Sequence, residues 1–477
     1  MGTSVGRETS EFSGQHWHFV GILGSGMQAM ARYAAERGVS VTGSDVQPSP
    51  AAADLRRLGI QVQLSQDKAN FDRATNLVVI SQAIEESNRE LVHARELGLE
   101  VVKYPELLGR LMDAQPGIAV AGAHGKSTTT AMIAYVLYRA GRDPSYLIGA
   151  DVPQLGGGSH HGTGEYLVAE ACEYRRSFLY LAPHVGVISN IDLEHTDYYH
   201  DIWDIQEAFC DFAGQIDADG ALVLNADDAN SRVAADAAQC EVVRYGIDDS
   251  KAQCRAERIW RAKKHTNFNL VYKGKQQGRF SIQLYGTHNI YNTLAAIAAC
   301  HQAGLSFDEM RQPIAEFEGA ARRLQLLGEP WDVAILSDYA HHPSEIRASL
   351  AATKQRFPNR RVFCLFQPHQ YSRTLAMLPQ LAEAFRGSWT TLVTDIFAAR
   401  DSEEDRQRVS ATDLVQLMNH LAMTAHYVPE LSDLEDIAVA EVVPRDVVLV
   451  MGAGNVWRVA RNIVPRIAEK GRRQIAA

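Results

Sequence analysis

The residue types and spacing best suited to chemistry occur in one short segment, Gly122-Ala123-His124-Gly125-Lys126-Ser127, which Thr128 follows. An apolar run, residues 117–120, precedes the segment, and apolar residues at helical spacing follow it. Glycines let backbone N–H groups face an anion, a helix N-terminus adds positive dipole, and a Lys–Ser pair can serve phosphates and magnesium. Val120 replaces the first glycine of the usual pattern, so a chance loop is the alternative, but the flanking strand and helix favour nucleotide binding.

Two further candidate residues follow the next two predicted strands. Glu170 ends a strand over residues 166–169, and His195 comes shortly after a strand over residues 185–189. Open α/β sheets keep their ligands at the carboxyl ends of strands, so both side chains could face the phosphate loop and hold divalent cations. Magnesium prefers oxygen ligands, which makes a histidine less usual. A Glu170–arginine pair and a surface histidine are the alternatives.

Polar side chains also gather in the C-terminal third of the chain. Arg322-Arg323 lies between two α/β blocks, where an arginine could reach transferring phosphate oxygens when domains close; a solvated charge pair is the alternative. Polar rings follow two later strands, in residues 338–343 and 367–373, and suggest a substrate cleft over a purely structural role. Pro343 is suited to the first position of a helix.

A glycine turn follows the first predicted strand. This turn, residues 21–26, opens a strand–helix–strand unit whose second strand ends at Asp45, and a second turn begins at Ser81. Its Gly-x-x-Gly-x-Gly spacing differs from the dinucleotide pattern Gly-x-Gly-x-x-Gly. Three interpretations stay open: nicotinamide binding, a diphosphate with Asp45 on a ribose, and a plain structural turn.

The elements that must position these residues form three α/β blocks, as a length of 477 residues allows. Residues 1–15 are expected to be a disordered leader, and the blocks span residues 16–115, 116–328 and 329–477. Within the second block, residues 254–285 alternate polar and apolar side chains, which predicts a small antiparallel insertion. The loop at residues 156–161 is expected to be mobile.

Composition excludes several classes of protein. A formal net charge of −10 argues against a surface that coats nucleic acid. The six cysteines form no Cys-x-x-Cys pair, which fits reduced thiols in the cytoplasm and no thiolate metal site. No apolar run approaches the length of a membrane span, so we expect no membrane insertion.

Taken together, these segments resemble the Mur ligase family from about His18 to Ala460, and their order and spacing are more specific than any one alone. The matching segments are 21–27 with 43–45, 122–130, Glu170, 190–191 with His195, 288–289 with Asn292, 317–323, 338–343, 366–374 and 451–454. The resemblance implies an α/β protein with three domains: a Rossmann-like N-terminal domain for UDP-sugar, a P-loop ATPase-like central domain with a parallel sheet for ATP and Mg²⁺, and a Rossmann-like C-terminal domain for the amino acid.

The resemblance also implies roles for single residues. Lys126 and Arg323 would contact the ATP phosphates, Ser127 and Glu170 would hold Mg²⁺, and His195 would serve a second metal. The residues implied in nucleotide binding are Gly122, Ala123, His124, Gly125, Lys126, Ser127, Thr128, His288, Asn289, Asn292 and Arg323. Those implied in substrate binding are Gly24, Ser25, Gly26, Met27, Asp45, Ser81, Tyr339, His342 and His369. The implied catalytic residues are Lys126, His195, Arg323, His341 and Arg373.

The implied reaction joins L-alanine to the lactyl carboxylate of UDP-N-acetylmuramate through an acyl phosphate, with ADP and phosphate as products, in peptidoglycan precursor synthesis. The alternative within the family attaches a recycled murein tripeptide to the same sugar nucleotide. A nicotinamide-dependent oxidoreductase and a nucleotide-gated binding protein are the alternatives outside it. The protein is expected to act as a monomer or a homodimer.

This chain departs from the family pattern in four places. The family often has Thr-His-Gly-Lys-Thr where this chain has Ala123-His124-Gly125-Lys126-Ser127, which keeps the hydroxyl ligand. Of the common Glu-Ala-Asp-Glu-Ser segment only Glu170 and Glu173 carry over, and a common arginine of the third domain is Gln370, which puts one anion contact in doubt. Some relatives carry a carbamylated lysine after the position of His195. No lysine occurs between Thr196 and Leu222, so none is expected here.

Overall fold

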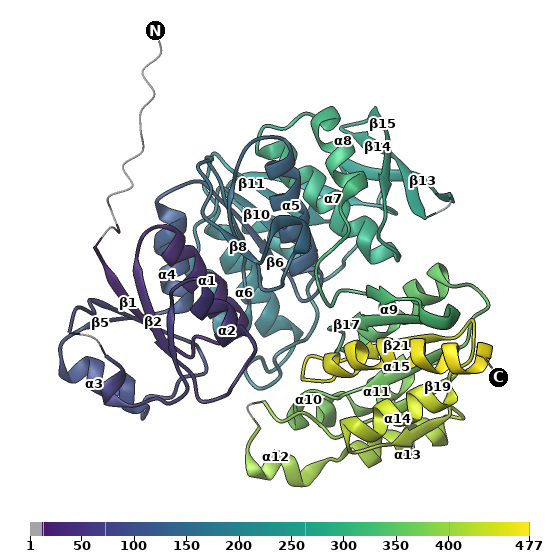
Figure 1. The fold of residues 1–477 in the computed structure, drawn as a ribbon. Coiled ribbons are helices and arrows are strands. Elements are labelled where there is room, and N and C mark those ends of the chain that lie inside the picture. The colour runs from purple at the N-terminus through teal and green to yellow at the C-terminus, as the bar shows by residue number, and fades with distance from the viewer. Residues whose placement is uncertain (1–11, 13, 72, 263, 400, 477) are drawn as a thin grey trace.

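The computed structural model describes residues 12, 14–71, 73–262, 264–399 and 401–476. Most of the predicted leader, residues 1–11 and 13, lies outside this described part. Each of the three α/β blocks builds its own sheet, and Figure 1 shows them as three successive domains along the chain. The predicted three-domain α/β fold with parallel sheets is therefore confirmed.

The first domain is a parallel five-stranded sheet in the order β3-β2-β1-β4-β5. Its strands are β1 (His16–Val20), β2 (Ser40–Ser44), β3 (Gln61–Gln63), β4 (Leu77–Ile80) and β5 (Glu100–Lys103). Its helices are α1 (Ser25–Glu36), α2 (Ala51–Arg57), α3 (Arg89–Glu96) and α4 (Tyr104–Asp113). The strand order reverses between β1 and β4, so the glycine turn and Ser81 end neighbouring strands at the crevice where such sheets bind ligands.

The central domain holds a ten-stranded sheet in the order β15-β14-β13-β12-β11-β10-β6-β9-β7-β8. Its parallel part comprises β6 (Gly117–Ala121), β7 (Ser145–Leu147), β9 (Leu167–Glu170), β10 (Val185–Ile188), β11 (Ala221–Asn225) and β12 (Glu241–Gly246). The order reverses between β6 and β10, so the phosphate loop and residues 189–190 lie side by side.

The predicted antiparallel insertion is an extension of this same sheet. The insertion consists of β13 (Cys254–Ala262), β14 (His265–Tyr272) and β15 (Lys275–Ile282). β14 pairs antiparallel with β13 and with β15, and β13 pairs in parallel with β12. At the other edge, β8 (Ser159–His160) pairs with β7, so part of the segment expected to be a mobile loop is a short strand.

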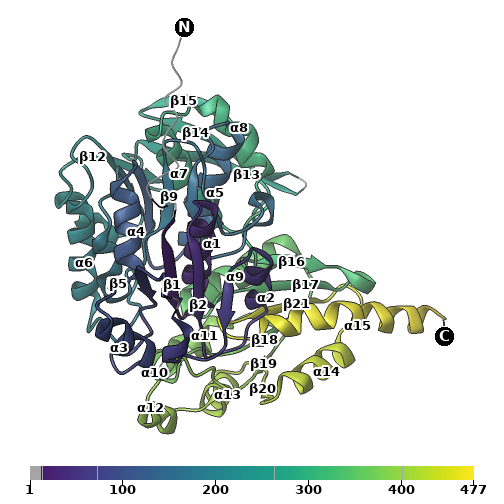
Figure 2. The same ribbon diagram turned by 60° about the vertical axis from the view of Figure 1, so that its left-hand side comes forward.

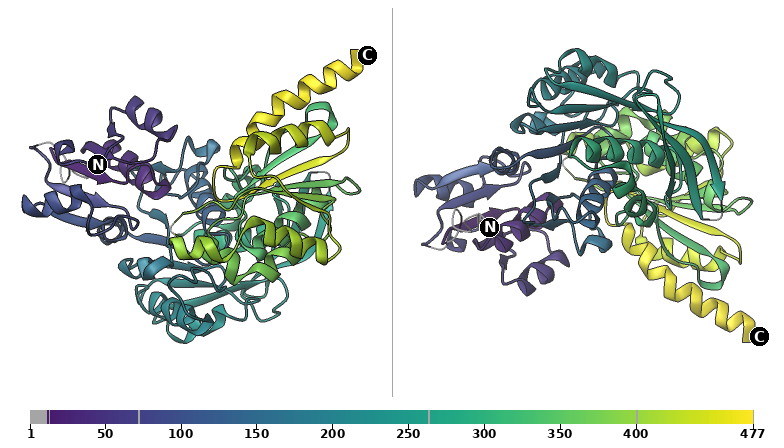
Figure 3. Two further views of the ribbon diagram at one scale, coloured as in Figure 1. Left: turned by 90° about the horizontal axis from the view of Figure 1, so that it is seen from below. Right: turned by 90° about the horizontal axis from the view of Figure 1, so that it is seen from above.

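The side chains of β6 alternate between the two faces of the central sheet, and each face packs against different helices. One face packs on α5 (Lys126–Arg139), α7 (Thr287–Gln302) and α8 (Phe307–Glu316). The other face packs on α6 (Ile202–Gly214), in a core that continues into α1 and α4 of the first domain. The first two domains therefore share apolar packing, as their adjacent ribbons show (Figure 3).

The third domain contains a six-stranded sheet in the order β16-β17-β21-β18-β19-β20. Its strands are β16 (Gln325–Gly328), β17 (Ala334–Asp338), β18 (Val362–Phe366), β19 (Thr390–Val393), β20 (Ala425–Tyr427) and β21 (Val447–Met451). Only β16 is antiparallel, and it precedes the domain boundary predicted after residue 328. Because β21 inserts between β17 and β18, residues 452–454 lie between the two polar strand ends.

Helices cover both faces of this third sheet. They are α9 (Pro343–Arg356), α10 (Tyr371–Ala376), α11 (Leu378–Ala384), α12 (Glu403–Arg408), α13 (Ala411–His420), α14 (Leu431–Glu441) and α15 (Trp457–Ala476). The long helix α15 extends outward from the domain (Figure 2). The N-terminus of α9 contacts the central domain.

Candidate active site between the central and third domains

The phosphate loop has the predicted strand–loop–helix form. β6 ends at Ala121, and α5 begins at Lys126. Gly122 and Gly125 have φ angles of 137° and 84°, a region that side chains disfavour. A Cβ on Gly122 would overlap Ser189, and a Cβ on Gly125 would overlap Asn292. The loop therefore needs both glycines, for conformation and for space.

Lys126 lies at the mouth of this loop, paired with a buried acid. Its Nζ donates to the Ala123 carbonyl at 3.1 Å and lies 3.0 Å from the carboxylate of Glu173, whose side chain has no exposed surface. Burial lowers the pKa of Lys126, but Glu173 and the further nearby groups Cys172 and Glu194 together outweigh burial and raise that pKa. Burial raises the pKa of Glu173, whereas Lys126 and His195 bring it down to about 2. Both groups are charged at neutral pH.

His195 lies beside two glutamates, one of which the sequence did not single out. Its Nε2 is 3.4 Å from Glu173 Oε1, and one ligand atom from each of Glu173, Glu194 and His195 lies within 4.8 Å of the others. Glu194 Oε1 and His195 Nδ1 are buried without a hydrogen-bond partner among the described residues. Glu170 ends β9, next to β6, and accepts a hydrogen bond from the Gly149 N–H at 2.6 Å. The adjacency of Glu194 and His195 was the one sequence signal for the missed glutamate.

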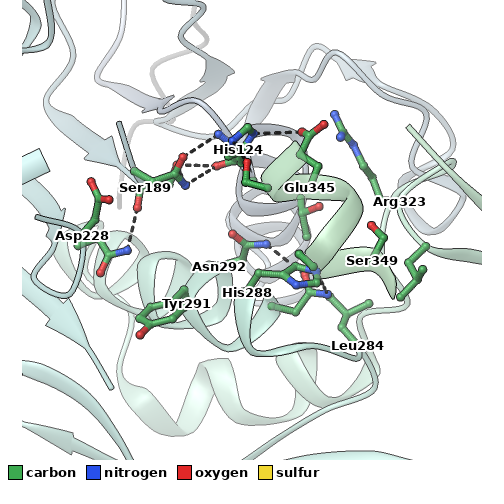
Figure 4. A pocket seen from close by; sticks show the side chains of 18 of the residues that line it. His124, Ser189, Asp228, Leu284, His288, Tyr291, Asn292, Arg323, Glu345 and Ser349 are labelled. Carbon is green, nitrogen blue, oxygen red and sulfur yellow. Dashed lines mark hydrogen bonds and ion pairs between the residues drawn. The ribbon is translucent and has the colours of Figure 1, made fainter. Parts of the chain in front are cut away.

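A cavity of about 370 Å³ opens beside the loop, between the central and third domains (Figure 4). His288, Asn289 and Asn292, all in the first two turns of α7, line it together with His124, Gly125 and Thr128 of the loop. Asn292 Nδ2 donates to Asn289 Oδ1 at 3.1 Å. Burial lowers the pKa of His288 to about 4, so this ring is neutral.

The cavity also has a polar wall that sequence reasoning missed. Tyr291 donates to Asp227 Oδ2 at 3.0 Å, and three backbone N–H groups from residues 247–249 also donate to Asp227. Burial raises the pKa of the neighbouring Asp228. Asp227 and Asp228 follow β11, one strand beyond β10, where the sequence shows no motif that would single them out. Lining residues absent from the predicted set include Asn190, Asn225, Asp227, Asp228, Tyr245, Tyr291, Ser344 and Glu345.

Arg322 and Arg323 point to different domains, and neither is a solvated surface charge. The Arg323 guanidinium donates to Ser127 Oγ at 3.2 Å, which links the interdomain segment to the phosphate loop. Arg322 donates to the Gly452 carbonyl at 2.9 Å. Both guanidiniums lie over the ring of Tyr339, at 4.7 and 5.0 Å from its centroid. Only Arg323 lines the cavity.

The polar residues after β17 and β18 form one cluster, although β21 lies between these two strands. His341 Nδ1 lies 3.1 Å from the Tyr339 carbonyl, and its ring is 5.9 Å from that of His369. Burial lowers the pKa of His341 to about 4, so this ring is also neutral. Arg373 lies 3.1 Å from His369 Nδ1 and is 7% exposed.

Two neighbouring positions of the third domain have backbone roles. His342 precedes α9 as its N-cap, and Pro343 is the first residue of this helix, as predicted. Gln370 is buried at a φ of 70°, donates its N–H to the Phe397 carbonyl at 3.0 Å and precedes α10. The position of the common family arginine is therefore a strained, buried turn in this chain.

The N-terminal glycine turn lies apart from this cavity, at the crevice of the first sheet. The N–H groups of Gly21 and Ile22 donate to the Ser44 carbonyl, and that of Leu23 donates to Asp45 Oδ2 at 2.9 Å. The turn leads directly into α1, whose first three residues are Ser25, Gly26 and Met27, with Gly24 just before them. Ser81, after β4, accepts from the Ala83 N–H at 3.3 Å. In this structure, then, Asp45 fastens the turn to β2.

Three family models match consecutive parts of the chain. They are the catalytic domain of the Mur ligase family over residues 16–116, the Mur ligase middle domain over residues 120–300, and the Mur ligase glutamate ligase domain over residues 322–454. Among the described residues, no helix combines the length and apolar character needed to cross a bilayer.

Similar proteins carry two kinds of name. A UDP-N-acetylmuramate–L-alanine ligase from Desulfitobacterium hafniense is 37% identical over 94% of this chain and 99% of its own. The crystal structure of a UDP-N-acetylmuramate–alanine ligase from Thermotoga maritima superimposes with a TM-score of 0.81 at 26% identity, over 95% and 99% of the two chains. A murein peptide ligase from Psychrobacter arcticus shares the fold, with a TM-score of 0.71 at 23% identity over 95% and 99%.

Proposed function

The chain belongs to the Mur ligase family, and on that premise we propose that it joins L-alanine to the lactyl carboxylate of UDP-N-acetylmuramate, with hydrolysis of ATP to ADP and phosphate. The observation that carries this proposal is the cavity between two domains, where the phosphate loop and Arg323 meet the N-terminus of α9. The names of relatives that align along nearly the whole chain supply the two substrates. This activity adds the first amino acid to a peptidoglycan precursor.

The residues of the central domain fit ATP. The positive φ angles of Gly122 and Gly125 let the loop curl before α5, and the N-terminus of α5 points its dipole toward the loop. Lys126 and Arg323 bring positive charge to the phosphates. His288, Asn289 and Asn292 offer neutral rings and amides to adenine and ribose in the adjoining cavity.

The donor set also fits Mg²⁺. Ser127 and Glu170 offer the oxygen ligands that this ion prefers, and His195 with Glu173 and Glu194 forms a second candidate site. The unpartnered Glu194 Oε1 and His195 Nδ1 support that second site, because buried polar atoms rarely lack partners. When bound, such cations neutralise charge on the phosphate oxygens.

The chemistry has two steps. A carboxylate is a poor acyl donor, so the lactyl carboxylate first attacks the γ-phosphorus of ATP, ADP leaves, and an acyl phosphate forms. The amine of L-alanine then attacks the acyl carbon, and phosphate leaves. Lys126 and Arg323 stabilise charge that builds on the transferring phosphoryl group. Arg373, held beside His369, is suited to bind the carboxylate of L-alanine.

The acceptor is L-alanine and not a tripeptide. The acceptor end is walled by the rings of Tyr339, His341 and His369, and Gln370 replaces an arginine that could have met an extra carboxylate. A small pocket discriminates a methylene by only about 1–3 kcal/mol, so some turnover of L-serine or glycine is compatible with the proposal. The enzyme works in the cytoplasm, as a monomer or a homodimer.

Phosphate release measured with single substrates omitted tests this proposal. We expect ADP and phosphate to form only when UDP-N-acetylmuramate and L-alanine are both present. The amount of amide product, measured by mass spectrometry, should equal the amount of phosphate released. Phosphate release that is the same with and without UDP-N-acetylmuramate and L-alanine would instead indicate a nucleotide-gated protein without ligase chemistry. Oxidation of a nicotinamide without amide formation would indicate the oxidoreductase alternative.

A further inference from the structure

The side chain of His124, in the phosphate loop, contacts helix α9 of the third domain. Its Nδ1 lies 3.2 Å from Glu345 Oε1 (Figure 4). Its Nε2 lies 2.8 Å from Ser344 Oγ, and Ser344 and Glu345 are both in the first turn of α9. Asp192, after β10, lies 3.3 Å from the same Nε2. The side chains of His124 and Glu345 are 19% and 14% exposed, so water screens this contact weakly.

Glu345 serves both domains at once. Its Oε2 accepts the N–H groups of His341 and His342 at 3.0 and 3.3 Å, which caps α9, while its Oε1 faces His124. The carboxylate therefore connects α9, the helix that directly follows Tyr339 and His341, to the phosphate loop. Burial lowers the pKa of His124, but Asp192 and Glu345 outweigh it and raise that pKa to about 10, consistent with a charged ring between two acids.

His124 is itself fixed to the central sheet. Its N–H donates to Asn190 Oδ1 at 2.8 Å, and its carbonyl accepts from Ser189 Oγ at 2.7 Å and from Asn190 Nδ2 at 2.9 Å. These hydrogen bonds hold the backbone of His124 at the end of β10. The contact therefore joins α9 to a backbone position that is fixed in the central domain.

We propose that Glu345 and Ser344 act with His124 as a latch that positions the third domain on the phosphate loop during the reaction. The role rests on the ligase activity proposed above. The latch holds the cluster of polar residues after β17 and β18 against the site where the acyl phosphate forms. A misplacement of reacting groups by about 1 Å can lower the rate about 100-fold. It also keeps water from the acyl phosphate, which would otherwise hydrolyse without forming an amide. Glu345 and Ser344 are thus positioning residues.

The first test compares Glu345→Gln with a matched control, Glu309→Gln. Gln keeps an oxygen for the helix cap but removes the charge that faces His124. Glu309 caps α8 in the same way, through the Ser306 N–H at 2.8 Å, and lies on the surface outside the cavity lining. We expect Glu345→Gln to raise the phosphate released per amide formed at least about twofold and to lower kcat about tenfold. KM for UDP-N-acetylmuramate should stay within about twofold of the parent value, and Glu309→Gln should match the parent.

The second test combines Glu345→Gln with His124→Gln. If the two side chains act as one latch, the double variant is no more uncoupled than the worse single variant, because partners in one contact do not add. Multiplied effects, or a phosphate-to-amide ratio unchanged from the parent in Glu345→Gln, would overturn the latch. If Glu345→Gln fails to fold, Ser344→Ala takes its place, since it removes the hydroxyl beside His124 Nε2 and leaves the carboxylate cap.

A structural readout separates the latch from the proposed function. Small-angle X-ray scattering of the full-length protein without substrates reports domain closure whatever the reaction is. We expect a larger radius of gyration for Glu345→Gln than for the parent and for Glu309→Gln, and equal radii would contradict the latch. If the parent enzyme forms no amide but Glu345→Gln has a larger radius of gyration than the parent, the proposed function is rejected and the latch is supported.

Discussion

Lys126 and Glu173 show how one side chain can serve both chemistry and stability. In the proposed reaction the ammonium group of Lys126 meets the phosphates, yet its side chain is only 17% exposed and its charge must be neutralised when no nucleotide is bound. Glu173, with no exposed surface, supplies that charge. Removal of one partner from a buried pair leaves the other uncompensated and costs about 3–5 kcal/mol. The loss of activity and the loss of stability in a Lys126 variant can therefore be separated.

Lys126→Ala should lower turnover on the order of a thousandfold, by analogy with other groups that stabilise a transferring phosphoryl. It should also lower the free energy of unfolding, because Glu173 stays buried without its partner. Adding Glu173→Gln to this variant should restore most of the stability and none of the turnover. Denaturant unfolding and phosphate release on the three proteins measure both effects. Near-normal turnover in folded Lys126→Ala would reject the phosphate-loop assignment.

Glu170→Gln and His195→Ala should each raise the magnesium concentration needed for half-maximal turnover, since each removes a ligand from a site that retains others. His184→Ala is the control, because His184 lies at the opposite end of β10, beside Asp217. Magnesium titrations of phosphate release decide the matter. Curves for Glu170→Gln and His195→Ala that overlay the parent would mean that these side chains are structural.

Helix α5 carries a glycine at each end, and the two differ in what surrounds them. Gly125, before the helix, and Gly141, after it, have φ angles of 84° and 75°. A Cβ on Gly125 would overlap Asn292, whereas a Cβ on Gly141 would meet nothing within 4 Å. Gly125 is required by its packing against helix α7 and by its backbone conformation, and Gly141 is required by its backbone conformation alone.

This difference predicts unequal effects of alanine. Gly141→Ala should cost about 1–2 kcal/mol, the strain of a left-handed residue with a side chain, and leave KM for ATP unchanged. Gly125→Ala should cost more and raise KM for ATP severalfold, because Asn292 must move. Thermal unfolding and ATP titrations compare the two. Equal effects would indicate that Asn292 does not constrain the loop.

The strands next to the site were predictable, because buried parallel strands are continuous apolar runs. The strand predicted over residues 185–189 is observed as Val185–Ile188, and Glu170 ends its strand as expected. The hairpin strands at residues 254–282 were recognised as antiparallel, but their attachment to the central sheet was not. The edge strand β16 was missed because its four residues are all half-buried, which leaves no apolar alternation to detect.

Across the whole molecule, the parts of the site come from distant positions in the chain. Arg323 and Ser127 are 196 residues apart, and His124 and Glu345 are 221 apart. Motifs could identify most of the predicted nucleotide-binding residues one by one, since each ends a strand or begins a helix. They could not show that α9 docks on the phosphate loop, because domain orientation depends on packing between surfaces that no local pattern encodes.

The choice of acceptor tests the central claim most directly. The protein is incubated with ATP, magnesium and UDP-N-acetylmuramate together with equal concentrations of L-alanine and L-Ala-γ-D-Glu-diaminopimelate, and mass spectrometry follows both amide products over time. We predict that the L-alanine product forms first and dominates, because the proposed acceptor end is lined by rings and Gln370 offers no positive charge to the extra carboxylates of the tripeptide. Faster formation of the tripeptide product would contradict the account, while leaving the fold and the phosphate chemistry intact.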